Sequence, residues 1–325
     1  MQNINKKVLI TGASGFIGRH LTKLLLDKGY YVVACGRQKT TRPGVKHDDL
    51  KQPRLKHPNL EYRKTNYGGI KLLKELLSGV DIVIHLAAKV HQMGKACDVV
   101  YQHENTLLTQ NLAQAAAEKG VQHFIFLSTI KVNGENTTNK AFDEQTPERP
   151  RGAYGRSKWL AEQQLKKIAV AHNMAWTIIR PPLVYGPRVQ ANFRRLLKLV
   201  DSHLPLPFKG IRNQRSMIAV DNLVDFIVHC LVAPQAQNQL FCVADPDSVS
   251  TSDLVQYLQT IRLGRSWLLP CPQKLLRALA KLLGKVRAVD RLTESLVIDS
   301  QKAQQLLDWK PKVNFREAAK LYFSR

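Results

Sequence analysis

The sequence has few cysteines, and none of them forms a close pair. The five are odd in number and widely scattered, with no CxxC spacing, at Cys35, Cys97, Cys230, Cys242 and Cys271. This pattern argues against a disulfide framework and against a cysteine zinc site, and it is typical of reduced thiols in the cytosol. We therefore expect a cytoplasmic protein that holds no metal.

Long hydrophobic runs are also missing. The amino-terminal segment offers only Val8, Leu9 and Ile10 before Thr11-Gly12 interrupts it, which is too short for the apolar core of a signal peptide. No run approaches the length of about 20 residues that a membrane span needs. With 44% hydrophobic residues, however, the chain is too apolar to be disordered. At roughly 150 residues per domain, its 325 residues suggest about two lobes.

Acidic residues are scarce. The 25 Asp and Glu residues face 49 Lys and Arg residues, which leaves a net charge of +24. Such an excess favours an anionic partner, either nucleic acid, an anionic membrane surface or a polyanionic small molecule. The basic residues are spread along the chain, and no DNA- or RNA-binding motif accompanies them, so we expect no nucleic acid partner.

Short apolar runs alternate with helical patterns through the first half of the chain. We predict strands over 7–11, 31–35, 82–86, 124–127 and 176–179, with helices over 16–27, 104–118 and 153–171 between them. Continuous apolar strands separated by helices are typical of a parallel sheet covered on both faces. After Arg180 prolines interrupt the pattern, and the last third is mostly helical. The prediction is an α/β protein, a Rossmann-type doubly wound parallel sheet with a smaller, mostly helical C-terminal substrate lobe; the first domain covers 1–180 plus about 216–245, and the second about 181–215 plus 246–325.

The segment TGASGFIG at 11–18 joins the first predicted strand to the first predicted helix. A helix amino terminus presents unpaired N–H groups and a partial positive charge, which suit a pyrophosphate. Gly12 allows a tight turn, Gly15 lets the backbone approach the ligand, and Gly18 lets helix and strand pack closely. The spacing is GxxGxxG and not GxGxxG. In this context it predicts a dinucleotide site.

The second predicted strand lacks the acidic residue that often holds the 2′-hydroxyl of the cofactor ribose. The region reads Val33-Ala34-Cys35-Gly36-Arg37. A guanidinium can hold a 2′-phosphate in a bidentate fork, whereas a carboxylate would repel it. Arg37 therefore favours NADP(H), with NAD(H) as the alternative cofactor; the other interpretation is a solvated loop residue.

Tyr154 and Lys158 stand four residues apart and share one face of a predicted helix. A phenol of pKa about 10 needs about 4 kcal/mol to ionise at neutral pH. A cation about 4 Å away, at an effective dielectric of about 20, supplies roughly that much, and an oxidised nicotinamide adds a second positive charge. Ser128-Thr129 ends a strand, where a hydroxyl can reach the reacting oxygen, although Thr129 can also cap its own backbone.

Taken together, these motifs resemble the extended short-chain dehydrogenase/reductase family over nearly the whole chain. Within it, the sequence looks most like bacterial UDP-sugar 4-epimerases and 4-keto-reductases of the UDP-N-acetylquinovosamine type. The resemblance rests on TGASGFIG (11–18), HLAA (85–88), Asn105, LST (127–129), YGRSK (154–158), IIRPPLVYGP (178–187), VDNLVDFI (220–227) and DSQKAQQLLDWKP (299–311).

The resemblance implies a set of site residues and a homodimer through the helices near 104–118 and 153–171. Thr129, Tyr154 and Lys158 would be catalytic. The cofactor would contact Gly12, Gly15, Phe16, Ile17, Gly18, Arg37, Leu86, Ala87, Ala88, Asn105, Tyr154, Lys158 and Pro181. The substrate would contact Ser128, Thr129, Lys131, Asn192 and Arg215.

Departures from the epimerase pattern bear on the reaction. Gly36-Arg37 replaces the acidic residue, and epimerases commonly have Asn where Leu183 stands and Tyr where Asn133 stands. An Arg-Pro-Gly-Asp segment is missing, with Arg287 or Arg291 as stand-ins. These departures favour NAD(P)-dependent reduction of a UDP-4-keto-6-deoxy-N-acetylhexosamine in surface-polysaccharide (O-antigen) sugar biosynthesis. The alternatives are a UDP-glucose or UDP-N-acetylglucosamine 4-epimerase, whose sugar is nucleotide- or lipid-linked, and, more distantly, a non-catalytic dinucleotide sensor.

The segment from Lys274 to Lys285 predicts an amphipathic basic helix, with leucines at 275, 276, 279, 282 and 283 in one stripe. One interpretation is peripheral contact through 274–287 with the inner face of an anionic membrane. The other is that the stripe packs on its own domain and leaves the lysines in water.

Overall fold

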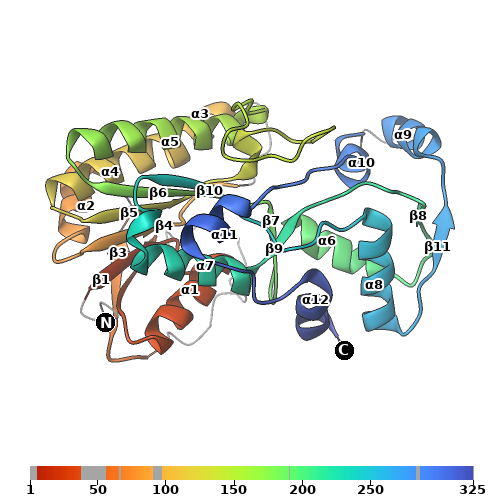
Figure 1. Ribbon diagram of the computed structural model, residues 1–325, viewed down its shortest axis with the longest axis horizontal. Helices are drawn as coiled ribbons and strands as arrows, with labels where there is room; N and C mark the ends of the chain where they lie inside the picture. The colour runs from red at the N-terminus through yellow and green to blue at the C-terminus, as the bar shows by residue number, and fades with distance from the viewer. Residues whose placement is uncertain are drawn as a thin grey trace, which may run out of the picture. The chain divides into compact units, whose positions relative to one another are not determined.

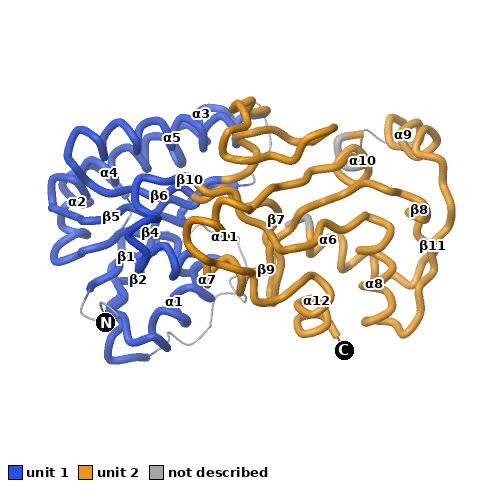
Figure 2. The backbone as a smooth tube through the Cα atoms, in the orientation of Figure 1, with its two compact units in different colours: residues 1–128, 152–178, 227–239 blue, residues 129–151, 179–226, 240–325 orange. Residues whose placement is uncertain are grey.

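The computed structural model describes residues 6–37, 56–65, 67–90, 97–189, 191–282 and 286–324 (Figure 1). The chain divides into two compact units (Figure 2). Unit 1 comprises residues 1–128, 152–178 and 227–239, and unit 2 comprises residues 129–151, 179–226 and 240–325.

This division differs from the predicted lobes mainly at 129–151, which the sequence pattern assigns to the first domain. The segment leaves the sheet after Ser128 and pairs by its backbone with residues near the carboxyl terminus. Thr137 N–H donates to the Ser295 carbonyl at 2.8 Å, and Phe142 N–H donates to the Val297 carbonyl at 2.8 Å. Such long-range pairing has no local sequence signal.

The main sheet is formed by strands from the first 180 residues together with one strand at 239–242. Among the described residues, seven strands are hydrogen-bonded in the order β10-β6-β5-β4-β1-β2-β3. The ladders of β1 with β2 and β4, of β2 with β3, and of β4 with β5 are parallel. The bounds are β1 Lys7–Thr11, β2 Tyr31–Arg37, β3 Leu60–Thr65, β4 Ile82–His85, β5 His123–Leu127, β6 Ala175–Arg180 and β10 Gln239–Cys242.

The sheet is buried between helical layers, as its apolar strands require. Val8, Leu9 and Ile10 of β1 and Phe124 and Phe126 of β5 are all fully buried. Figure 1 shows α4 and α5 on one face of the sheet and α1 on the other. The strands and helices confirm the predicted doubly wound fold. The helices of this part are α1 Phe16–Asp27, α2 Gly69–Leu76, α3 Cys97–Tyr101, the π-helix Gln102–Leu107, α4 Leu108–Glu118 and α5 Gly152–Ala171.

Unit 2 is mostly helical towards the carboxyl terminus, as predicted. Two small parallel pairs accompany the helices: β7 (Leu183–Tyr185) with β9 (Met217–Ala219), and β8 (Leu206–Lys209) with β11 (Leu268–Pro270). Its helices are α6 Ala191–Val200, α8 Thr251–Leu263, α9 Gln273–Leu282, α10 Val286–Thr293, α11 Gln301–Leu307 and α12 Phe315–Phe323, with a 3₁₀ turn at Ile130–Val132. Helix α7 (Val220–Val232) begins in unit 2 and ends in unit 1, which also holds the 3₁₀ turn Pro234–Ala236.

Asp245 links the parts of unit 2 around β7 and β9. Its buried carboxylate accepts hydrogen bonds from the Tyr185 hydroxyl at 2.7 Å, the Asn222 amide at 2.7 Å and the Ala219 N–H at 3.0 Å. A buried carboxylate is costly unless donors surround it, and here three do. The arrangement fixes the start of α7.

Candidate active site

The strand order reverses between β1 and β4, and the two strands end beside each other. In open α/β sheets ligands bind outside the carboxyl ends of the strands at this reversal. Gly12 follows β1 with φ +71°, and a Cβ built on it would lie 2.9 Å from the amide nitrogen of Ala87, which follows β4. The turn after β1 and the segment Leu86–Ala88 therefore pack backbone against backbone.

Helix α1 begins tightly against this turn. A Cβ on Gly18 would lie 2.3 Å from the Gly12 carbonyl oxygen, so the first turn of the helix rests on the loop itself. Gly15 is the N-cap residue and has no side chain to satisfy the amides at the helix start, and Phe16 and Ile17 follow it half-exposed. The exposed N–H groups and the positive helix end suit a pyrophosphate. These residues fit the dinucleotide predicted from the sequence.

A network of buried hydrogen bonds connects the residues at the ends of β1 and β4, next to the glycine loop. The Thr11 hydroxyl lies 2.6 Å from His85 Nδ1 and accepts from the Ala87 N–H at 3.2 Å. The other ring nitrogen of His85 lies 3.0 Å from the Thr109 hydroxyl, which donates to the Asn105 carbonyl at 2.6 Å. Burial, and to a lesser degree the charge of Lys158, lowers the pKa of His85 to about 3. His85 is thus a neutral core residue that fixes the ends of β1 and β4.

Asn105 uses its side chain to join the loop after β4 to α5. Its oxygen accepts from the Lys89 N–H at 2.8 Å, while its amide donates to the Lys89 carbonyl at 3.1 Å and to the Ser157 hydroxyl at 3.0 Å. Asn105 is 1% exposed. Within the chain, this side chain positions the loop and the start of α5, and its predicted contact with the cofactor stays a prediction.

Tyr154 and Lys158 lie on the first turns of α5, as predicted. Lys158 is 2% exposed, and its Nζ lies 4.1 Å from the centroid of the Phe126 ring in β5. Tyr154 is half-buried, with its ring 5.9 Å from that of Tyr101. Together with the effect of Lys158 on His85, these contacts place the ammonium near the carboxyl ends of β4 and β5.

The titration of this pair differs from the expectation that a charged Lys158 lowers the pKa of the phenol. Burial raises the pKa of Tyr154, and the neighbouring phenol of Tyr101 raises it further. Burial also lowers the pKa of Lys158 to about 7, although the charge of Glu162 raises it. Desolvation disfavours both charged forms, so ionisation of the phenol needs further positive charge, such as that of an oxidised nicotinamide.

Glu162 is a candidate positioning residue that we did not predict. It lies one helical turn beyond Lys158 on α5, is fully buried, and accepts a hydrogen bond from the hydroxyl of Ser128 at the end of β5. Ser128 was predicted to contact the substrate, and here it holds this carboxylate. The signal in the sequence is an acidic residue four positions after a buried lysine.

We expect Glu162→Gln to shift the alkaline limb of the kcat/KM profile. Because the carboxylate favours the charged form of Lys158, its removal lowers the pKa of the ammonium, and activity should be lost about one pH unit lower. Glu75→Gln makes the same chemical change on the exposed surface of α2 and should leave the limb in place. An unmoved limb in Glu162→Gln would show that the carboxylate does not act on Lys158.

In unit 2, three predicted residues lie around the 3₁₀ turn that follows β5. Thr129 caps this turn, since its hydroxyl accepts from the Lys131 N–H at 3.4 Å. Lys131 Nζ pairs with Glu135 at 3.1 Å, and the Pro181 carbonyl accepts from the Ile130 N–H at 3.0 Å. Thr129 is 8% exposed. Its hydroxyl makes the backbone cap that the sequence offered as the alternative to a substrate contact. Its role towards a substrate stays a prediction.

Arg215 is half-buried in unit 2 and donates to the Glu294 carbonyl at 2.9 Å. Burial lowers the pKa of Arg215, and the nearby charge of Arg291 in α10 lowers it further. Two guanidinium groups thus lie near each other. The side chains of Asn192, Arg37 and Arg287 lie outside the described part of the structure. Strand β2 ends at Arg37, two residues beyond the predicted strand 31–35.

The departure at Asn133 has a structural explanation. Its buried amide donates to the carbonyls of Asp143 and Thr146 and accepts from Arg180 Nη1 at 3.0 Å. Arg180, whose side chain is fully buried, also pairs with Glu148 at 2.9 Å. Asn133 therefore completes a polar cluster inside unit 2, and its presence does not by itself favour a reductase.

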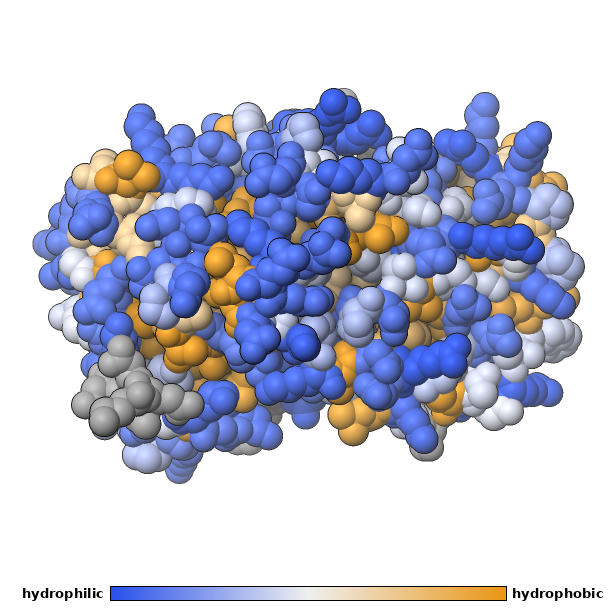
Figure 3. All heavy atoms as spheres, in the orientation of Figure 1, coloured by the Kyte–Doolittle hydropathy of each residue, from blue (hydrophilic) through white to orange (hydrophobic). Residues whose placement is uncertain are grey.

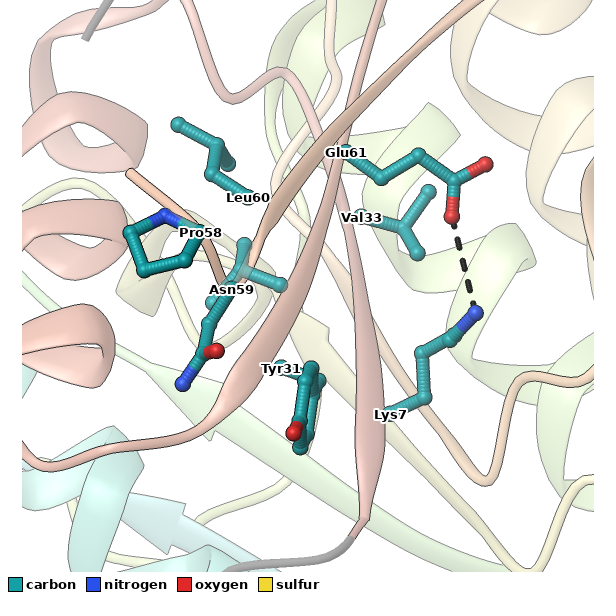
Figure 4. A pocket seen from close by; sticks show the side chains of 8 residues that line it. Lys7, Tyr31, Val33, Pro58, Asn59, Leu60 and Glu61 are labelled. Atoms are coloured by element: carbon teal, nitrogen blue, oxygen red, sulfur yellow. Dashed lines mark ion pairs between the residues drawn. The ribbon is translucent and has the colours of Figure 1, made fainter. Parts of the chain in front are cut away.

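A small cavity of about 210 Å³ lies at the amino-terminal ends of strands β1, β2 and β3 (Figure 4). Lys7 and Tyr31, the first residues of β1 and β2, line it together with Leu60 and Glu61 of β3. Lys7 and Glu61 form an ion pair at 3.5 Å across it. Because ligands of parallel sheets bind at the carboxyl ends of the strands, this cavity is not the cofactor site.

Known proteins match the chain over most of its length. The sequence model of the NAD-dependent epimerase/dehydratase family matches residues 8–244. A UDP-glucose 4-epimerase of Vibrio cholerae is 39% identical over 321 residues, which cover 97% of this chain and 94% of the relative. An N-acetyl-α-D-glucosaminyl-diphospho-ditrans,octacis-undecaprenol 4-epimerase of Escherichia coli O157:H7 is 29% identical over 257 residues, 78% of this chain and 71% of that one.

Solved structures agree on the fold. The crystal structure of a UDP-glucuronic acid 4-epimerase from Bacillus cereus in complex with NAD superposes with a TM-score of 0.75 at 23% identity, covering 98% of this chain and 97% of that one. At this identity the likeness concerns the fold alone.

Among the described residues, none of the helices combines the length and apolar character that crossing a bilayer requires.

Proposed function

The chain belongs to the NAD-dependent epimerase/dehydratase family, and from this premise we propose that it is a UDP-sugar 4-epimerase. The observation that carries the proposal is the likeness to the UDP-glucose 4-epimerase of Vibrio cholerae, which extends over 97% of the chain at 39% identity. The half-buried Tyr154 and the buried Lys158 on α5 supply a proton-transfer group of the kind this reaction needs. The dinucleotide loop lies in the same unit.

Each residue has a distinct task in this proposal. A bound nicotinamide would supply the chemistry of taking a hydride from carbon 4 and returning it to either face. Tyr154 removes the proton of the 4-hydroxyl and later gives it back, and Lys158 stabilises the phenolate in between. Desolvation keeps the Tyr154 phenol neutral until further positive charge arrives, and it leaves Lys158 with a pKa of about 7. Glu162 and Asn105 position Lys158 and the start of α5.

The substrate diphosphate has a candidate partner in unit 2. Arg215 and Arg291 bring two guanidinium groups near each other, and guanidinium groups bind phosphate in a bidentate manner. The effect of its charge on Arg215 supports Arg291 as the stand-in for the missing Arg-Pro-Gly-Asp segment. Thr129 and Pro181 remain proposed contacts of substrate and cofactor.

Reduction of a UDP-4-keto-6-deoxy-N-acetylhexosamine, our first expectation from the sequence, becomes the second candidate. The absence of an acidic residue at Gly36-Arg37 still favours it, together with a preference for NADP(H). Against it, Asn133 has a structural role and the relatives compared above are named epimerases. The preference for NADP(H) over NAD(H) and the homodimer stay predictions.

The cofactor balance separates the two reactions. We expect the purified protein to interconvert a UDP-hexose and its C4 epimer, such as UDP-glucose and UDP-galactose or their N-acetyl counterparts, while the absorbance of reduced nicotinamide stays constant. Chromatography resolves the epimers, and a parallel reaction contains the 4-keto sugar with NADH or NADPH. Consumption of one reduced cofactor per keto sugar, without any epimer formed, would overturn the epimerase proposal in favour of the reductase.

A further inference from the structure

Apolar side chains remain exposed on α9 and on the strand before it. Leu275 and Leu282 are 52% and 84% exposed, and because they stand seven residues apart they share one face of the helix. Trp267 is 51% and Leu269 is 44% exposed on and beside β11. The other side of α9 packs inward through Ala280, which is 4% exposed. Leu275 and Leu282 of the predicted leucine stripe are therefore largely exposed to solvent and contribute little to the core of the unit.

The surroundings of these side chains are cationic. Between Asp253 and Asp290 the sequence contains seven basic residues and no acidic one. Lys274, Arg277 and Lys281 of α9 line an open depression of about 490 Å³ with Ala278 and Val286. Figure 3 shows hydrophilic side chains with hydrophobic areas among them at the end of the molecule that carries α9 and β11. Of the three cations, Arg277 also reaches Asp290 at 3.3 Å.

We propose that the exposed side chains of α9 (Lys274, Leu275, Lys281 and Leu282), with Trp267 and Leu269 on and beside β11, bind the surface of an anionic phospholipid bilayer. Exposed leucines and a tryptophan insert at the boundary of head groups and acyl chains, while lysines beside them pair with lipid phosphates. Tryptophan is enriched at this boundary because its ring is apolar and its N–H is polar. A nucleic acid would use the charge but leave the leucines in water, so the bilayer fits both features.

Vesicle binding of the full chain tests this proposal. We expect co-sedimentation with phosphatidylcholine vesicles that contain about 30% phosphatidylglycerol, weaker binding at high salt, and little binding to phosphatidylcholine alone. The double variants Leu275→Ser/Leu282→Ser and Lys274→Glu/Lys281→Glu should each lower the partition coefficient by about tenfold or more. Tryptophan emission should shift to the blue with the anionic vesicles, and Trp267→Phe should remove that shift.

A matched control uses another exposed helix of the same unit. Lys320→Glu/Leu321→Ser on α12 changes one exposed lysine and one leucine that is 74% exposed, and it should bind vesicles as the unchanged protein does. Circular dichroism and melting temperature establish that every variant is folded, independently of any catalytic assay. Equal binding to both vesicle types, no binding at all, or wild-type binding by the α9 variants would each overturn the proposal. The proposal would also be overturned if only nucleic acid or a second protein displaced the bound protein from the vesicles.

Discussion

Tyr154→Phe is expected to lower kcat by a factor of about 10² to 10⁴ while the affinity for the dinucleotide stays nearly unchanged. The substitution removes one hydroxyl and keeps the ring that packs 5.9 Å from Tyr101. We do not expect Lys158 to replace the phenol, because its Nζ lies 4.1 Å from the centroid of the Phe126 ring. Steady-state kinetics on a UDP-sugar and calorimetric titration with NAD measure the two effects separately.

Tyr101→Phe provides the matched control. It removes the neighbouring phenol, whose hydroxyl donates to the Val90 carbonyl at 2.9 Å, and it leaves Tyr154 in place. We expect a small change in kcat, because this hydroxyl is used for structure. If Tyr154→Phe kept kcat within tenfold of the unchanged protein, or if Tyr101→Phe lost as much activity, the proton would have to come from another group.

The parts of the site that the sequence predicts are those in which a few consecutive residues set the geometry. The glycine loop needs only a strand, a positive φ at Gly12 and a helix start, and all of these lie within 7–18. Tyr154 and Lys158 share a face because the helical repeat places them there. The parallel sheet follows from apolar runs separated by helices, since parallel strands need crossovers.

The remaining parts depend on pairs of residues that are far apart in the chain. Ser128 meets Glu162 across 34 positions, and Thr11 meets His85 across 74, so no local pattern announces either contact. The register of β1 and β4 decides the pair of Thr11 and His85, and the position of α5 decides the pair of Ser128 and Glu162. The desolvation that raises the pKa of Tyr154 also comes from packing and not from its neighbours in the sequence. For this reason the sequence placed Tyr154 and Lys158 on one helix and gave the wrong direction for the pKa of the phenol.

Gly18→Ala is expected to destabilise the fold and to weaken dinucleotide binding strongly. At an open helix position this change stabilises a protein by about 1 kcal/mol, so the sign of the effect is itself diagnostic. Here the new Cβ would lie 2.3 Å from the Gly12 carbonyl oxygen and 2.7 Å from the Ala13 Cα, and both are backbone atoms that cannot swing aside. Relief requires α1 to move away from the loop, which we expect to cost about 3 kcal/mol.

The displacement of α1 would also carry its amides away from the pyrophosphate. Gly36→Ala is the matched control, since the same methyl group at the end of β2 would meet only the Ser14 Oγ at 3.9 Å. Urea unfolding with and without NAD reports stability and binding in one experiment. We expect Gly18→Ala to lose stability and most of the stabilisation that NAD gives, because a ligand stabilises only in proportion to its binding. A Gly18→Ala protein as stable as Gly36→Ala, and equally stabilised by NAD, would show that the close contact of helix and loop does not form the cofactor site.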